Sequence, residues 1–104
     1  MYEIKFAEDV SRDLMELRLF YRQEILDKID IQLTYEPTLE TRNKKIVPNA
    51  NPPWPFKEPL RELRIGEYRV FYDVDAEALQ VVVRAIRHKP PKRLQRRYYE
   101  TNGP

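Results

Sequence analysis

The chain has 104 residues and a formal net charge of +2, which indicates one compact globular domain. It contains no cysteine and a single histidine, so disulfides, thiolate zinc sites and two-histidine metal motifs are excluded. No stretch has the apolar length of a signal peptide or a membrane span. We therefore expect a cytoplasmic protein that has no membrane contact and needs neither a metal nor another cofactor.

The charge is unevenly distributed along the chain. Residues 1–40 carry a net charge of −5, whereas residues 84–104 carry +6. This separation predicts one anion-facing surface, with nucleic acid as the natural partner. The alternative is a solvated basic tail without a target. We expect a single domain over residues 1–104, with a long proline-rich loop at 38–59 and a basic tail at 90–104.

The first half of the chain predicts one strand and two helices. Residues 2–6, YEIKF, alternate between apolar and polar side chains, as a half-buried strand does. From Val10 to Leu33 the apolar residues recur at helical spacing, which predicts two amphipathic helices with a bend near residues 17–20. Pro37 then ends the helical pattern.

The proline-rich loop (residues 38–59) holds five of the nine prolines, so we expect no regular structure there. A loop of this length is either functional or attached to the body of the domain. Trp54 and Phe56 are the predicted attachments. The basic segment at 41–45 either contacts phosphate or is solvated.

Residues 60–65 and 68–74 predict a hairpin. A type II′ turn suits Gly66 at its first central position, and this register places Arg64 directly opposite Arg69. Facing like charges destabilise a sheet by roughly 0.2–1 kcal/mol, so the pair requires an explanation.

Two explanations of the arginine pair stay open. Paired guanidinium groups are well suited to binding phosphate. Alternatively, Glu62 lies two residues from Arg64 and could neutralise the pair within the fold.

A third strand is predicted at residues 79–86. Strict alternation places Arg84, Ile86 and His88 on one face, where they could join Arg64 and Arg69. Arginines and an imidazole that titrates near neutrality are the groups needed for acid–base cleavage of RNA. The alternative is a surface histidine without a role.

The order of these elements is strand, two helices, loop and three strands. It predicts an α+β domain in which two N-terminal amphipathic helices pack on one face of a small, largely antiparallel sheet.

Three segments together resemble the RelE/ParE toxin superfamily of bacterial toxin–antitoxin systems, with the RelE-like branch favoured. They are YEIKF, LRELRIGEYRVFYDVD and VVVRAIRHK. The resemblance implies that Arg69 stabilises phosphate, that Arg64 and Lys89 are further basic positions, and that His88 is the acid or base. The carboxylate that some members use could be Glu58 or Glu62.

The resemblance also implies a function and partners. It favours a ribosome-dependent mRNA endoribonuclease that inhibits translation, bound by a cognate antitoxin. The alternative is a non-catalytic binding module of the same fold, either a gyrase inhibitor or a domesticated relative, and a homodimer also stays open. The basic residues expected to contact nucleic acid are Arg84, Arg87, Lys92, Arg93, Arg42, Lys44 and Lys45.

Overall fold

The computed structural model describes residues 1–89. The predicted basic tail at 90–104, including Lys92 and Arg93, lies outside these residues. The elements in chain order are β1 (Glu3–Phe6), α1 (Val10–Met15), α2 (Leu19–Leu33), β2 (Lys44–Ile46), β3 (Arg61–Ile65), β4 (Tyr68–Asp75) and β5 (Gln80–His88). In this part of the chain, neither helix has the length and apolar content needed to cross a bilayer.

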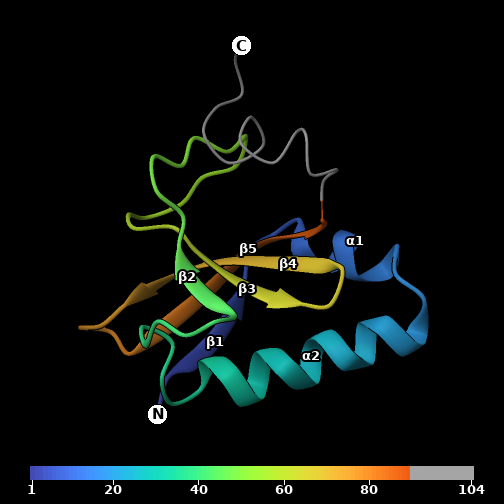
Figure 1. The fold of residues 1–104 in the computed structure, drawn as a ribbon, viewed down its shortest axis with the longest axis horizontal. Coiled ribbons are helices and arrows are strands. Elements are labelled where there is room, and N and C mark those ends of the chain that lie inside the picture. Colours follow the sequence, from blue (N-terminus) through green and yellow to red (C-terminus); the bar gives the residue numbers. More distant parts are fainter. Residues whose placement is uncertain (90–104) are drawn as a thin grey trace.

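The five strands form one sheet in the order β1-β5-β4-β3-β2. β1 pairs with β5 in parallel, and the other three pairings are antiparallel. Figure 1 shows the sheet in the middle of the molecule, with α2 running along one side of it. The predicted α+β architecture with a largely antiparallel sheet is confirmed.

The helices bury their apolar stripe against one face of the sheet. Ile25, Ile29 and Leu33 follow one another at intervals of one helical turn, and all three are buried. They belong to the main core together with Val70 and Tyr72 of β4. Helical spacing from Val10 to Leu33 therefore predicted the packing face correctly.

A second, smaller core covers the opposite face of the sheet. Trp54 and Phe56 of the proline-rich loop pack there against Phe71 and Ala85. The prediction that both aromatic residues attach the loop to the body is confirmed. A loop fastened in this way has a fixed position beside the sheet.

The prediction that the proline-rich loop lacks regular structure is wrong at Lys44–Ile46. These residues form β2, an edge strand paired with β3. Three residues are too few to show an alternating pattern, and the strand precedes the prolines, which begin at Pro48. Successive side chains of a strand point to opposite faces of the sheet, so the two lysines lie on different faces. Lys44 is buried, whereas Lys45 is exposed.

The hairpin between β3 and β4 has the predicted register. Arg64 pairs with Arg69, and Ile65 pairs with Tyr68 across the turn. Gly66 has a φ of 56°, the left-handed value that the first central position of a type II′ turn requires. The two arginines therefore do face each other.

The predicted grouping of Arg84, Ile86 and His88 on one face is wrong. A bulge shifts the register, so that Tyr72 pairs with Val83 and Phe71 with Ala85. Arg84 is the extra residue, and each residue after it changes face. Ile86 consequently lies in the helix-side core.

Candidate functional site

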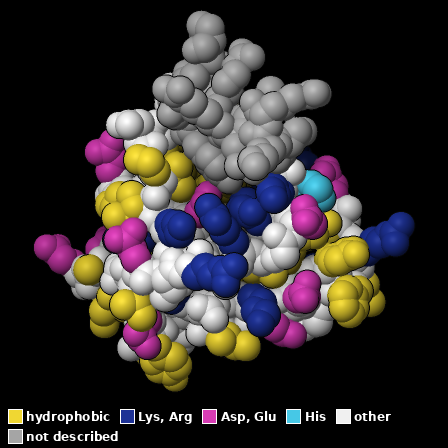
Figure 2. All heavy atoms as spheres, viewed as in Figure 1, with side chains coloured by type: hydrophobic (Ala, Val, Ile, Leu, Met, Phe, Trp, Pro, Cys, Tyr) yellow, Lys and Arg dark blue, Asp and Glu magenta, His cyan; other side chains and the backbone are white. Residues whose placement is uncertain are grey.

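The arginine row (Arg64, Arg69 and Arg87) crosses three adjacent strands on the face away from the helices. Arg69 pairs with Arg64 of β3 on one side and with Arg87 of β5 on the other. Figure 2, viewed as in Figure 1, shows Lys and Arg side chains gathered over the sheet. Three guanidinium groups at adjacent positions concentrate hydrogen-bond donors that suit an anionic ligand.

Arg69, the central member of the row, is held by the backbone of the hairpin turn. Its side chain is largely buried, and its Nη1 donates to the carbonyl oxygens of Gly66 at 3.0 Å and of Tyr68 at 2.9 Å. A guanidinium carries five N–H donors in a fixed plane. The turn therefore sets the orientation of the group.

Glu62 lies beside the row and is 4% exposed. Its Oε1 accepts a hydrogen bond of 2.9 Å from Nε of Arg64, whose side chain is 41% exposed. On the other side, Glu62 pairs across the sheet with Lys45. The site thus contains a buried carboxylate between cations, and this carboxylate both lowers the local positive charge and provides an acceptor.

Arg87 connects the row to α1 and to the proline-rich loop. Its Nη1 donates to Oδ2 of Asp13 at 2.8 Å, and its guanidinium carbon lies 4.9 Å from the centre of the Trp54 ring. The same Asp13 oxygen accepts the backbone N–H of Ile86. A carboxylate from α1 and a cation–π contact therefore hold Arg87 in place.

Arg84 serves chiefly to hold the fold together. Its Nε donates to Oδ2 of Asp73 at 2.7 Å and its Nη2 donates to Oδ1 at 3.3 Å. Oδ2 of Asp73 also accepts the backbone N–H of Lys57 at 2.8 Å. The pair therefore joins the proline-rich loop to β4 and β5.

His88 lies on the opposite face of the sheet from the arginine row. It pairs with Tyr68, and the two rings meet edge to face with their centres 5.3 Å apart. Its Nδ1 lies 3.1 Å from the carbonyl oxygen of Lys89, whose own backbone N–H donates to the carbonyl oxygen of Glu67. The imidazole therefore does not join Arg64 and Arg69.

The remaining basic candidates have different surroundings. Lys44 is 4% exposed, and its Nζ donates to the carbonyl oxygens of Gln32, in the last turn of α2, and of Glu36, just beyond the helix. Burial lowers the pKa of Lys44, and the nearby Glu36 partly opposes that shift. Arg42 and Lys45 are exposed, and only Lys45 borders the row, through its pairing with Glu62.

The structure also identifies supporting residues that the sequence did not reveal. Asp13 and Asp73 each hold an arginine, but each contact spans more than ten residues of chain. Their only sequence signal is a carboxylate beside apolar neighbours, which is common on helices and strands. Glu58, the other candidate carboxylate, is exposed and precedes Pro59 in the loop.

The site as a whole combines guanidinium donors with one buried carboxylate. Among residues 1–89, no group of three or more His, Cys, Asp or Glu side chains is placed to hold a metal ion. Guanidinium groups can bind a phosphate and stabilise charge that develops on it, while a carboxylate can accept a proton.

Comparisons with solved structures identify the fold. A chain of an archaeal RelE–RelB complex of Pyrococcus horikoshii has a TM-score of 0.64 at 22% identity, and the match covers 85% of this chain and 94% of that one. The isolated RelE toxin of Escherichia coli has a TM-score of 0.66 at 17% identity, covering 93% and 94%. A chain of the RelBE2 complex of Mycobacterium tuberculosis has a TM-score of 0.58 at 23% identity, covering 85% and 98%.

Comparisons of sequence are more specific about the family. A search of curated proteins found no match. The family model of the ParE toxin of the type II toxin–antitoxin system parDE matches residues 4–90, which is most of the chain. The chain belongs to the ParE toxin family, within the RelE/ParE superfamily of toxins.

Proposed function

We propose that this toxin binds RNA at the arginine row and cleaves it, as a ribosome-dependent endoribonuclease that inhibits translation. The observation that carries the proposal is the position of Glu62, a buried carboxylate that is hydrogen-bonded to Arg64 at one end of a row of three arginines on adjacent strands. Phosphodiester cleavage without a metal requires this combination of a base and cationic donors.

In this mechanism Glu62 takes the proton from a ribose 2′-hydroxyl. The 2′-oxygen then attacks the adjacent phosphorus, and Arg69 and Arg87 stabilise the charge that develops on the phosphate oxygens. The bond from phosphorus to the 5′-oxygen breaks, and water supplies the proton for that oxygen. The products are a 2′,3′-cyclic phosphate and a free 5′-hydroxyl.

Arg64 has a positioning role in this mechanism. Its hydrogen bond to Oε1 holds the Glu62 carboxylate, and it adds positive charge at the edge of the site. Lys45, on the other side of Glu62, is exposed and available to an RNA backbone. Mutating Lys45 should therefore weaken RNA binding without removing the chemistry.

Induced expression followed by primer extension tests the proposal. The wild-type protein should arrest growth and produce discrete 5′ ends within translated mRNA, and Arg69→Ala should produce neither. Translational arrest without new mRNA ends would refute the nuclease mechanism.

The pairing of Glu62 with Arg64 favours a second candidate, a non-catalytic binding module that inhibits gyrase. A carboxylate that is already neutralised is suited to a structural role, and the family match to ParE agrees with this alternative. A supercoiling assay with purified gyrase separates the two functions. The second candidate predicts inhibition of supercoiling by a protein that leaves mRNA intact.

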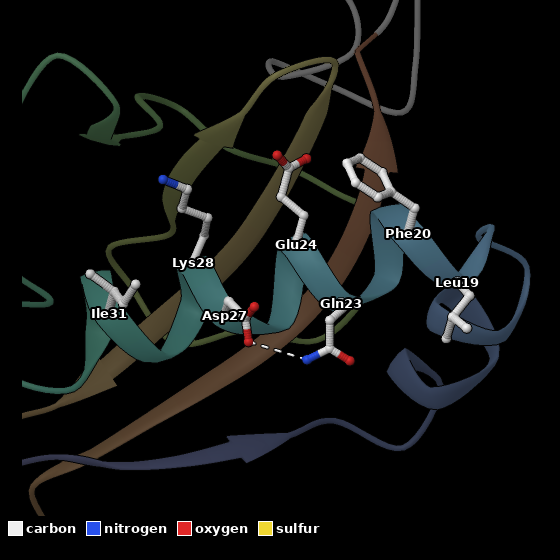
Figure 3. A pocket seen from close by; sticks show the side chains of 7 residues that line it. All are labelled: Leu19, Phe20, Gln23, Glu24, Asp27, Lys28 and Ile31. Carbon is white, nitrogen blue, oxygen red and sulfur yellow. Dashed lines mark hydrogen bonds between the residues drawn. The ribbon is translucent and has the colours of Figure 1, made fainter.

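We also propose that a cognate antitoxin covers the outer side of α2. Leu19, Phe20 and Ile31 are each at least 66% exposed there, and they border a groove of about 610 Å³ that also contains charged side chains. Figure 3 shows the apolar residues at the two ends of the groove, with Glu24, Asp27 and Lys28 between them. An amphipathic antitoxin helix would match this pattern. The structures of RelE–RelB complexes support the expectation of such a partner.

Copurification with the product of a neighbouring antitoxin-like gene tests this partner. Phe20→Lys should abolish copurification, whereas Met15→Lys on α1, where the side chain is 69% exposed, should not. Equal retention by both variants would place the antitoxin elsewhere. Light scattering of the toxin alone distinguishes a homodimer formed through the same groove.

A further inference from the structure

A second concave feature lies beside the arginine row, between the proline-rich loop and the start of α1. This Trp54 recess has a volume of about 380 Å³. Its walls come from the segment Ala7–Asp9, from Asp13, from Pro53–Pro55 and from Arg84 and Arg87. Arg87 therefore belongs to both the row and the recess.

Trp54 lines the recess and carries an unpaired donor. One contact of its ring is with Phe71, at 5.3 Å between centres, and another is with the Arg87 guanidinium. Its Nε1 is buried, and among residues 1–89 it is the only buried side-chain polar atom that lacks a hydrogen-bond partner. Buried donors are rarely left unpaired, so the packing around Trp54 is incomplete without a further acceptor.

The opposite wall of the recess presents acceptors. Glu8 and Asp9 are exposed carboxylates at its rim, whereas Asp13 is already paired with Arg87. The recess therefore combines carboxylate acceptors, guanidinium donors, and flat aromatic and proline surfaces. A ligand that fits must be planar, must donate on one edge and must accept on another.

We propose that the Trp54 recess binds a nucleobase that carries an exocyclic amino group, at the nucleotide next to the phosphate held by the arginine row. This proposal rests on the proposed function. The amine of cytosine, adenine or guanine would donate to Glu8 or Asp9, a ring or carbonyl acceptor would receive a hydrogen bond from Arg87, and the base would stack on the Trp54 ring. Uracil has a carbonyl oxygen where cytosine has the amine, so its only donor on that edge is N3–H and it is disfavoured.

The mixed charge of the recess argues against other ligands. A free phosphate would face the carboxylates of Glu8 and Asp9, and a lysine or arginine side chain of a peptide would face Arg84 and Arg87. A neutral base that has a donor edge and an acceptor edge is repelled neither by the carboxylates nor by the arginines. The phosphate of the same nucleotide would lie towards Arg69, because Arg87 borders both the Trp54 recess and the arginine row.

The single tryptophan of the chain makes the proposal directly measurable. Titration of the purified full-length toxin with CMP should change Trp54 fluorescence with saturation, and CMP should bind about tenfold more tightly than UMP, a difference in the range of one good base contact. Equal affinities for CMP and UMP, or no saturable change with CMP, would overturn the proposal.

Variants at the rim separate base selection from phosphate binding. The double variant Glu8→Gln, Asp9→Asn should bring the CMP and UMP affinities within about threefold of each other, because an amide no longer offers a purely accepting edge. Glu77→Gln, at an exposed position in the turn between β4 and β5, is the matched control and should leave the preference unchanged. Selectivity that survives in the rim variant would refute the assigned role of the carboxylates.

Failure of this proposal can be distinguished from failure of the proposed function. If the wild-type toxin cleaves mRNA but binds CMP and UMP equally, the nuclease function stands and the base site is wrong. If CMP binds selectively and no RNA is cleaved, the base site stands and the nuclease function is wrong.

Discussion

The replacement of Asp73 by asparagine tests how the site is held together. Asp73 is 1% exposed, and Oδ2 accepts hydrogen bonds both from Nε of Arg84 and from the backbone N–H of Lys57. Asp73→Asn keeps the shape of the side chain but removes its charge. The side chain of Arg84, which is 18% exposed, then has no counter-ion in a poorly solvated position.

Breaking a buried ion pair by removing one partner costs about 3–5 kcal/mol. Asn keeps one acceptor oxygen and Arg84 retains some contact with water, so we expect a loss of about 3 kcal/mol in the free energy of unfolding. Urea unfolding monitored by circular dichroism measures this loss. Trp54 fluorescence, recorded in parallel, should show that the proline-rich loop loosens first.

Asp75→Asn is the matched control for this prediction. Oδ2 of Asp75 lies 3.6 Å from Nζ of Lys57, and the side chains of Asp75 and Lys57 are both much more exposed than that of Asp73. A surface pair of this kind contributes less than about 1 kcal/mol. Asp73 does not hold the site together in this way if Asp73→Asn costs no more than Asp75→Asn, or if adding Arg84→Met to Asp73→Asn recovers none of the lost stability.

Three further predictions concern the fold. Lys44→Met should lower the free energy of unfolding by about 1–3 kcal/mol in urea, because two carbonyls at and just beyond the end of α2 lose their donor, and it should leave RNA affinity unchanged in a filter-binding assay. Burial raises the pKa of Tyr72 from 10.0 to about 12, so its stabilising contribution is complete below pH 10 and is lost as the pH rises through 12. This amounts to about 3 kcal/mol, and Tyr72→Phe should remove the loss when urea unfolding is repeated between pH 9 and 12. Gly66→Ala should cost about 1 kcal/mol in the same urea assay, entirely through the backbone, since no atom lies within 4 Å of an added Cβ.

Local patterns predicted the parts of the fold that depend on local physics. Helical spacing identified the buried face of α2, and Gly66 with its alternating neighbours established the register that places Arg64 opposite Arg69. Both signals work because a regular element repeats its side-chain direction over many residues.

The bulge at Arg84 could not be predicted from local patterns. A single extra residue exchanges the faces of everything that follows it, and no residue in the segment marks its position. Strict alternation therefore assigned His88 to the arginine face, where the structure places Arg87. The long-range partners Asp13 and Asp73 were missed for a related reason, since their pairings depend on how the strands are aligned.

Glu62 and the arginine row lie on the opposite side of the sheet from His88, and we propose that they carry out the chemistry without it. The measurement is the rate of mRNA cleavage in a reconstituted translation reaction, read by primer extension, for the wild type, Glu62→Gln and His88→Gln. We expect a loss of about 10²–10⁴-fold for Glu62→Gln, and a rate within about threefold of wild type for His88→Gln. Full activity of Glu62→Gln together with loss of activity in His88→Gln would contradict this proposal.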